Sequence, residues 1–235
     1  MTAREHKLKL DVERVGTVSA LLTEPAGKQS VKPRTCFVFA HGAGAGMMQA
    51  FMQRTAAELA ERNIVSLRYQ FPYMEKGSRR PDSPTIAHAT VRAAVAEAAR
   101  QCPGLVLIAG GKSFGGRMTS QAQALAPLPG VQGLAFFGFP LHPDGKPSTE
   151  RANHLTKIDI PMLFLQGTRD RLADLRYLEP IVEKLGAKAK LHEVAWGDHS
   201  FQVLAKSGRS NDEAMEEVLD TFATWADELS SAAAL

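Results

Sequence analysis

The sequence is poor in cysteine and has no long apolar run. Its two cysteines, Cys36 and Cys102, are too few for a disulfide framework or a structural zinc site, and Cys36 lies in an apolar run that predicts a small core residue. No segment approaches the roughly 20 apolar residues that a helix needs to span a bilayer. Residues 1–13 alternate polar and apolar side chains, unlike the continuous apolar stretch of a secretory signal. By elimination we expect no membrane partner and a cytoplasmic location.

A strong excess of charge of one sign is also missing. The formal net charge is +3, and the basic residues are spread along the chain. Nucleic-acid binders usually concentrate lysine and arginine into a stripe or a motif. The densest basic cluster, Lys76, Arg79 and Arg80, is accompanied by Glu75 and Asp82 and predicts a solvated loop. We therefore expect no nucleic-acid partner.

The order of apolar and helical segments predicts the fold class. Residues 8–13 and 15–22 alternate as half-exposed antiparallel strands do. From residue 36 onward, short apolar runs alternate with helical spacing, which predicts a mostly parallel α/β sheet with helices on both faces. We expect a single domain over residues 1–235. The strands predicted in this part are 36–40, 64–69, 105–108, 131–137, 161–165 and 190–194, and the helices are 48–62, 83–101, 114–125, 172–185 and 211–229.

The strongest motif is a G-x-S-x-G sequence, residues 111–115, directly after the predicted strand 105–108. A strained strand-to-helix turn raises a serine hydroxyl above the sheet edge and tolerates only small residues two positions away on either side. Gly111 and Gly115 meet that need, so the motif predicts Ser113 as a nucleophile. A Walker A loop would need glycine where Val106 stands, so that interpretation fails. A plain glycine-rich turn is the remaining alternative.

A second small-residue loop, residues 41–46, follows the predicted strand 36–40. Small residues allow backbone N–H groups to approach a developing oxyanion. We expect one donor from Phe114 and a second from this loop, with Ala43 favoured and Gly44 next. A dinucleotide-binding fingerprint is excluded because Met47 stands where its third glycine belongs. His41 is interpreted as structural.

An acid and a base follow the last two predicted strands. Asp170 comes after strand 161–165, and His199 lies on a loop after strand 190–194. The order Ser, Asp, His, each after a strand, is the order of α/β-hydrolases. Asp170 alone would be interpreted as a turn or N-cap residue, and Asp174, inside the predicted helix, is the weaker alternative acid. The set predicts a catalytic triad of Ser113, Asp170 and His199.

With these motifs the chain resembles a compact, capless α/β-hydrolase similar to dienelactone hydrolases, and more closely the bacterial relatives of a eukaryotic testis-expressed hydrolase-like family. The resemblance covers nearly the whole chain and implies about eight strands, with one antiparallel strand near the edge. Dienelactone hydrolases proper carry a cysteine nucleophile where this chain has Ser113, so their lactone substrate is not carried over. The matching segments are 39–44, 68–84, 111–116, 138–143, 166–170 and 197–201.

The segment 141–160 is too short for a full lid, so we expect an open site. Its predicted substrate-binding residues are Met47, Tyr73, Phe114, Phe139 and Leu141. Three basic residues flank the motifs and are interpreted as solvated surface charge, with recognition of an acidic group as the alternative. They are Lys112, Arg169 and Arg171.

The leading hypothesis is a serine hydrolase, of the carboxylesterase type, that acts on a small-molecule ester or related acyl substrate through an acyl-enzyme. Nothing in the sequence indicates a metal or an organic cofactor. Two alternatives stay open. One is a non-catalytic protein-interaction module on the same scaffold. The other is an acyltransferase or peptidase that uses the same three residues.

Overall fold

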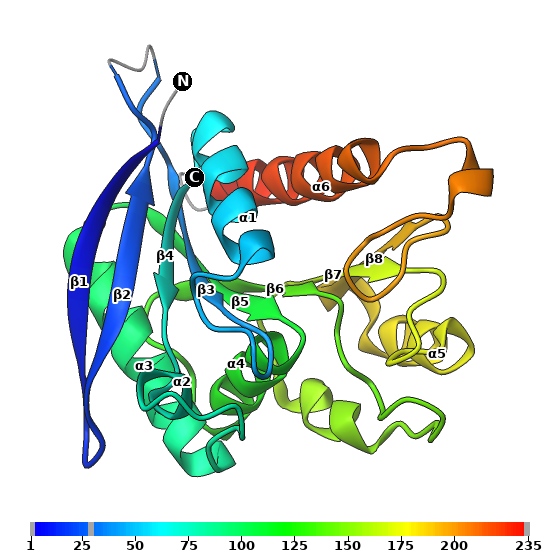
Figure 1. Cartoon of the computed structure of the whole chain (residues 1–235), viewed down its shortest axis with the longest axis horizontal. Coiled ribbons are helices and arrows are strands. Elements are labelled where there is room, and N and C mark those ends of the chain that lie inside the picture. Colours follow the sequence, from blue (N-terminus) through cyan, green and yellow to red (C-terminus); the bar gives the residue numbers. More distant parts are fainter. Residues whose placement is uncertain (1–2, 28–30, 233–235) are drawn as a thin grey trace.

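The computed structural model describes residues 3–27 and 31–232. Within them, one eight-stranded sheet runs through the molecule in the order β1-β2-β4-β3-β5-β6-β7-β8 (Figure 1). The strands are β1 (Arg4–Val12), β2 (Gly16–Glu24), β3 (Thr35–Ala40), β4 (Val65–Tyr69), β5 (Val106–Lys112), β6 (Val131–Phe137), β7 (Met162–Gly167) and β8 (Ala189–Val194).

Strand β2 is the antiparallel member of the sheet. It pairs antiparallel with both β1 and β4, whereas every pair from β4 to β8 is parallel. The expected eight strands and the expected antiparallel strand next to one edge are therefore confirmed. Because the strands from β3 to β8 are parallel, their carboxyl ends meet at one edge of the sheet, where α/β proteins place ligands.

Helices cover both faces of the sheet, as the alternating pattern predicts. In Figure 1, α1 and α6 lie on one side, and α3, α4 and α5 lie on the other. The α-helices are α1 (Ala50–Glu61), α2 (Pro72–Glu75), α3 (Pro84–Gln101), α4 (Phe114–Leu125), α5 (Leu175–Leu185) and α6 (Asn211–Ala232), and the 3₁₀ segments are η1 (Glu150–Lys157), η2 (Gly186–Lys188) and η3 (Ala205–Ser207).

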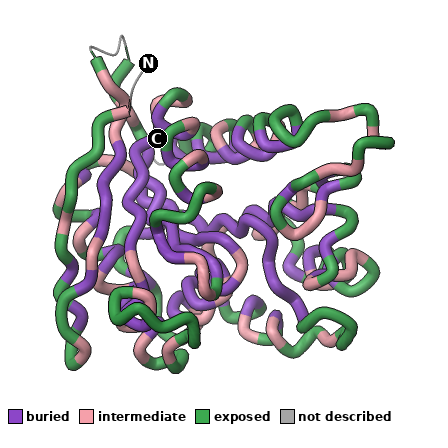
Figure 2. The backbone as a smooth tube through the Cα atoms, viewed as in Figure 1, coloured by how far each residue is buried: buried purple, intermediate pink, exposed green. Residues whose placement is uncertain are grey.

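Strand β3 shows how the sequence fills two cores at once. Its successive side chains point to opposite faces: Cys36 and Val38 join the core beneath α3 and α4, while Phe37 and Phe39 join the core beneath α1 and α6. All six residues of β3 are buried, which explains its continuous apolar run. Figure 2 shows this burial through the central strands, whereas the edge strand β1 is largely exposed.

The structure corrects several predicted boundaries. Strand β5 continues to Lys112, although the glycines at 110 and 111 predicted its end at Ile108. A β-carbon placed on Gly111 would lie 2.3 Å from the carbonyl oxygen of Ala40, so close strand packing, not a turn, requires glycine there. Helix α5 begins at Leu175 instead of residue 172, with Asp174 as its N-cap. The short segments α2 and η1 were not predicted.

No helix in residues 3–27 and 31–232 has the length and apolar character needed to cross a membrane.

Candidate active site

Ser113 sits on a strained turn between β5 and α4. Its backbone has φ 50° and ψ −116°, a left-handed conformation that is uncommon for any residue except glycine. The turn is held because the Ser113 N–H donates to the carbonyl of Phe137, while its own carbonyl accepts from the Arg117 N–H. The serine therefore stands at the N-terminus of α4, where the helix dipole favours negative charge.

Close backbone packing surrounds this turn. A β-carbon on Gly115 would lie 2.6 Å from the carbonyl oxygen of Ala40, so a larger residue there would displace α4 from β3. On the opposite side, a β-carbon on Gly42 would lie 3.8 Å from the β-carbon of Ser113. The loop after β3 and the serine turn are therefore direct neighbours, as the two small-residue motifs predict.

The structure brings the predicted acid and base together. His199 Nδ1 lies 2.6 Å from Asp170 Oδ2. The Asp170 side chain is fully buried, and its Oδ1 accepts from the Leu172 N–H at 2.8 Å. Asp170 therefore serves both as a turn residue and as the partner of His199. Asp174, the weaker alternative, instead caps α5 and pairs with Arg176 at 2.6 Å.

Gln166 holds this acid in place, a contact that sequence reasoning missed. Its Nε2 donates to Asp170 Oδ2, and its Oε1 accepts from the Phe139 N–H at 2.9 Å. Gln166 is completely buried at the end of β7. A glutamine within an apolar strand, four residues before the candidate acid, was the available signal for this role, because a buried amide needs partners.

The loop that carries His199 is fixed by its own hydrogen bonds and by Lys112. Asp198 Oδ1 accepts from the N–H groups of Ser200 at 2.7 Å and Gln202 at 3.0 Å. Lys112 Nζ donates to the carbonyl oxygen of His199. Lys112 is buried, so its interpretation as solvated surface charge is wrong.

Ser113 and His199 both lie against the end of β6, although no hydrogen bond joins their side chains in the described residues. Ser113 bonds to Phe137, and a β-carbon on the next residue, Gly138, would lie 3.2 Å from His199 Nδ1. His199 Nε2 is buried and has no hydrogen-bond partner within the described residues. A buried ring nitrogen without a partner costs about 1–3 kcal/mol, and catalytic hydrogen bonds often form only in the substrate complex.

Two backbone N–H groups next to Ser113 are candidates for an oxyanion hole. For Ala43 and Phe114, the described part of the chain shows no acceptor for the backbone N–H. The Gly44 N–H, in contrast, donates to the hydroxyl of Tyr73 at 3.0 Å and is occupied. The preference for Ala43 over Gly44 therefore has a physical reason.

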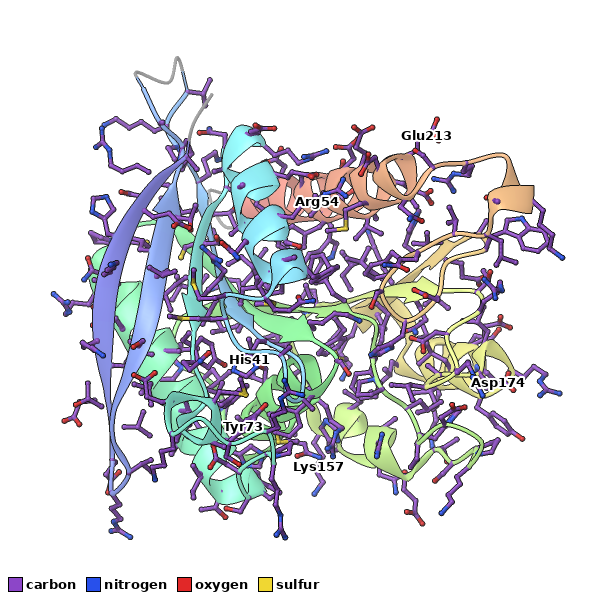
Figure 3. The ribbon with its side chains drawn as sticks, in the orientation of Figure 1. His41, Arg54, Tyr73, Lys157, Asp174 and Glu213 are labelled. Atoms are coloured by element: carbon purple, nitrogen blue, oxygen red, sulfur yellow. The ribbon has the colours of Figure 1, made fainter. Side chains whose placement is uncertain are left out.

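His41 is structural, as predicted. Its Nδ1–H donates to the Gly42 carbonyl at 2.7 Å, and its Nε2 accepts from the Phe71 N–H at 3.1 Å. Burial lowers the pKa of His41 to about 4, against a smaller opposing effect of the Gly42 carbonyl. The ring centroids of Tyr73 and His41 lie 6.0 Å apart, and Figure 3 labels both residues in the lower half of the view.

Burial corrects the predicted rim of the substrate site. Phe139 is 1% exposed and Leu141 is 0% exposed, so both belong to the core and present almost no surface to a substrate. Phe139 packs against Phe136 with ring centroids 5.3 Å apart. Met47 and Tyr73 are also buried, and their polar atoms hold the loop after β3.

The other two flanking basic residues are exposed, as predicted for solvated charge. Arg169 reaches the Trp196 carbonyl at 3.4 Å, and Arg171 pairs with Asp144 at 3.1 Å. Within residues 3–27 and 31–232, no group of three or more His, Cys, Asp or Glu side chains gathers in the manner of a metal site.

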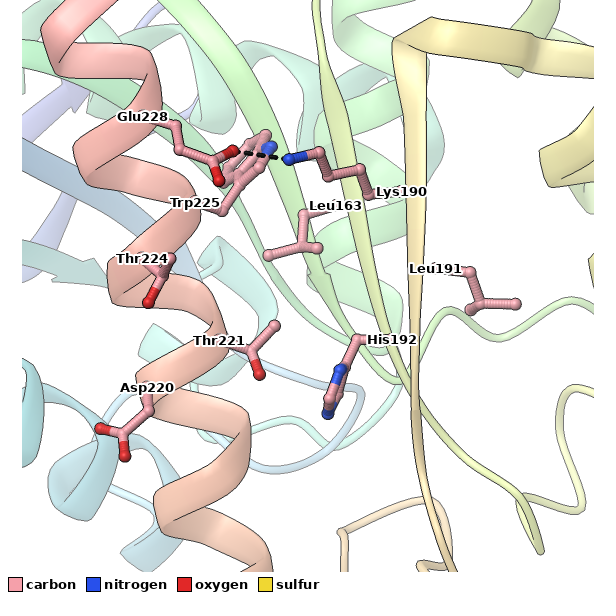
Figure 4. A pocket seen from close by; sticks show the side chains of 9 residues that line it. All are labelled: Leu163, Lys190, Leu191, His192, Asp220, Thr221, Thr224, Trp225 and Glu228. Atoms are coloured by element: carbon pink, nitrogen blue, oxygen red, sulfur yellow. Dashed lines mark hydrogen bonds and ion pairs between the residues drawn. The ribbon is translucent and has the colours of Figure 1, made fainter.

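A separate hollow of about 420 Å³ lies between β8 and α6 (Figure 4). Leu163 and Trp225 line it from the core beneath α1 and α6, and Lys190 pairs with Glu228 across its mouth at 2.5 Å. None of Ser113, Asp170 and His199 lines this hollow.

Comparison with known proteins gives a consistent result. Residues 33–227 match the family model described as the alpha/beta hydrolase domain. A serine hydrolase without a lid from Xanthomonas campestris is similar in structure, with a TM-score of 0.72, 21% identity, and coverage of 94% of this chain and 95% of that one. A dienelactone hydrolase from Anabaena variabilis has a TM-score of 0.71 at 19% identity, covering 96% and 97%.

A third similar structure is a cold-adapted esterase from an Arctic intertidal metagenomic library, with a TM-score of 0.66, 16% identity and coverage of 95% and 94%. At these identities the solved structures show the fold alone. The predicted resemblance to capless α/β-hydrolases is thereby confirmed, while the finer likeness to the testis-expressed relatives stays a prediction.

Proposed function

The chain belongs to the α/β-hydrolase domain family, and we propose that it is a serine hydrolase that cleaves small or medium ester bonds, or related acyl bonds. The observation that carries this proposal is the 2.6 Å contact between His199 and a fully buried Asp170, at the same sheet edge as a strained Ser113. The likeness to hydrolases and esterases supports it.

The first half of the reaction acylates the serine. Ser113 Oγ attacks the carbonyl carbon of the ester, and the hydroxyl proton passes to His199 Nε2. Asp170 fixes the tautomer of His199 by accepting from Nδ1–H, and it stabilises the imidazolium that forms. The N–H groups of Phe114 and Ala43 stabilise the oxyanion. The alcohol then leaves with the proton of Nε2, and the acyl group remains on Ser113.

The second half releases the acid. A water gives a proton to His199 Nε2 and attacks the acyl carbon, and the bond to Ser113 Oγ breaks as that proton returns to the serine. The product is a carboxylic acid. Each step uses side chains of this chain and water, and the substrate is a small molecule.

Hydrolysis of p-nitrophenyl acetate by the wild type and by Ser113→Ala tests the proposal. We expect kcat to fall on the order of 10⁶-fold in the variant, because the three residues act as a unit. Ser200→Ala is the matched control, since Ser200 is an exposed serine next to His199. Full activity of Ser113→Ala would exclude the mechanism. A panel of p-nitrophenyl esters with increasing chain length then defines the acyl preference.

A further inference from the structure

Four cationic or titratable side chains gather next to α4, outside the proposed triad. Arg117 lies one helical turn after Ser113, His88 extends from α3, and Arg151 and His154 extend from η1. The segment η1 packs against α4, and Figure 1 shows it beside that helix. All four side chains are half-buried.

Among the described residues, neither arginine of this cluster has a carboxylate partner. Within the described part of the chain, Arg117 and Arg151 form no ion pair, whereas Arg176, on the surface, pairs with Asp174. Arg151 Nη1 reaches only the carbonyl of Pro140 at 3.4 Å. Arg117 Nε is buried and has no hydrogen-bond partner among residues 3–27 and 31–232. Leaving such a charged donor unpaired is costly.

The charges of the two arginines act on each other. Burial, and secondly the charge of Arg151, lower the pKa of the Arg117 guanidinium, and burial lowers that of Arg151. The Arg117 guanidinium carbon lies 5.9 Å from the ring centroid of Phe114. The cluster is therefore a site of uncompensated positive charge against an apolar ring.

The two histidines do not add to this charge at neutral pH. Ser120 Oγ donates to the Arg117 carbonyl, so it accepts from His154 Nε2–H at 2.7 Å. Burial, then the charges of Arg117 and His88, lower the pKa of His154 to about 4. The pKa of His88 is also lowered, mainly by burial. Two positive charges remain, both on arginines.

Both arginines belong to segments that adjoin the proposed nucleophile or the strand that follows it. The Arg117 N–H donates to the Ser113 carbonyl at 3.1 Å, and side chains on a helix lean toward its N-terminus, here toward Ser113. Arg151 bonds to the carbonyl of Pro140, two residues after Gly138, where an added β-carbon would lie 3.1 Å from the carbonyl oxygen of His199. Arg117 therefore starts one helical turn from Ser113 with its guanidinium over the Phe114 ring, and Arg151 is tied to the segment that follows β6.

We propose that Arg117 and Arg151 bind a carboxylate carried by the ester, so that the substrates are acidic esters such as monoesters of dicarboxylic acids. This inference rests on the proposed hydrolase function. A guanidinium presents two parallel N–H donors that match a carboxylate, and a carboxylate between two arginines relieves their repulsion. Arg169 and Arg171 are exposed and are not part of this site.

Paired substrates test the proposal. The first pair is mono-p-nitrophenyl glutarate, which carries the carboxylate on the acyl side, and p-nitrophenyl pentanoate, its neutral match. The second pair is 4-acetoxybenzoate, which carries the carboxylate on the leaving group, and its neutral match 4-acetoxybenzamide. We expect the wild type to prefer one charged ester over its neutral match in kcat/KM. Arg117→Met and Arg151→Met lower kcat/KM for that charged ester by about 10- to 100-fold, the value of charged hydrogen bonds. Both substitutions change kcat/KM for the neutral ester by no more than about 3-fold.

Arg171→Met is the control, since Arg171 is exposed and pairs with Asp144. We expect this variant to retain the preference for the charged ester. Thermal unfolding establishes that each variant is folded, and Arg117→Lys, which keeps the charge, recovers part of the preference. Equal kcat/KM for both members of each pair in the wild type, or a preference that survives in Arg117→Met and Arg151→Met, would overturn the proposal. Hydrolysis of the neutral esters that depends on Ser113 would still support the proposed hydrolase. Failure of the carboxylate site is therefore distinguishable from failure of the proposed function.

Discussion

Lys112 Nζ donates a hydrogen bond to the backbone carbonyl of His199, and so joins the residue before the proposed nucleophile to the loop of the proposed base. The ammonium also lies 5.6 Å and 5.7 Å from the ring centroids of Phe51 and Phe201. Burial lowers the pKa of Lys112 to about 8, although the charges of Asp170 and Asp198 act to raise it. Lys112 is therefore mostly charged at pH 7 and acts as a positioning residue for His199.

Lys112→Met tests this role. We expect kcat to fall by about 10- to 100-fold with little change in KM, because a displacement of about 1 Å in a reacting group is enough for such a loss. We expect the free energy of unfolding at pH 7 to stay within about 1 kcal/mol of the wild type, because an apolar side chain replaces a buried charge. Urea denaturation and ester hydrolysis measure the two quantities. An unchanged kcat in a folded variant contradicts the positioning role.

Gly138→Ala places a methyl group against the same two residues. Its β-carbon would lie 3.0 Å from Lys112 Nζ and 3.2 Å from His199 Nδ1, on a backbone with φ 72°. We expect kcat to fall by about 100-fold, because the imidazole must move. Gly145→Ala is a matched control: its φ is 68°, but nothing lies within 4 Å of the new β-carbon. If both variants lose activity equally, backbone strain and not displacement of His199 is the cause.

Ala43→Pro removes one proposed oxyanion donor. Proline has no N–H, and Ala43 is not among the residues with positive φ, a conformation that proline cannot adopt. We expect kcat to fall by about 10²–10³-fold, the value of one donor, while KM changes little. Steady-state kinetics on p-nitrophenyl acetate measure both quantities. A variant with wild-type kcat would assign the donor to another N–H.

His41 makes the stability of the fold depend on pH. Its pKa is lowered from 6.5 to about 4, so between these values the unfolded chain binds a proton that the folded protein does not. The contribution of neutral His41 to the free energy of unfolding is complete above pH 6.5 and is lost as the pH falls toward 4. This group lowers the free energy of unfolding by about 2 kcal/mol between pH 7 and pH 5. We expect His41→Gln to show a correspondingly smaller decrease in urea denaturation. Equal decreases in the two proteins would exclude His41 as the cause.

Most of the sheet was predictable because its central strands are short and largely buried, and β3 and β7 are buried throughout. Helix α4 and strand β6 have the predicted bounds, residues 114–125 and 131–137. The end of β5 was misplaced, since a glycine pair that usually marks a turn here allows close strand packing. The segment η1 has few apolar residues, of which Ala152 and Leu155 are buried, and it lacks the regular spacing that predicts a helix.

For the site, chain order and position after strands were enough to predict Asp170 and His199, which the fold brings into contact. Burial was not predictable in the same way. Lys112 resembles surface charge in sequence, and Phe139 and Leu141 resemble pocket residues, yet all three are buried. Contacts such as that of Lys112 with the His199 carbonyl join segments far apart in the sequence, so their geometry is fixed only once the sheet is assembled.

Covalent labelling with a fluorophosphonate, followed by mass spectrometry of the labelled peptide, tests the proposed chemistry of Ser113 most directly. We expect stoichiometric modification of Ser113 in the wild type and a strongly reduced rate in His199→Gln, because a serine that the imidazole does not deprotonate is a weak nucleophile. An unlabelled Ser113 in folded wild-type protein would contradict the proposed hydrolase and favour a non-catalytic scaffold.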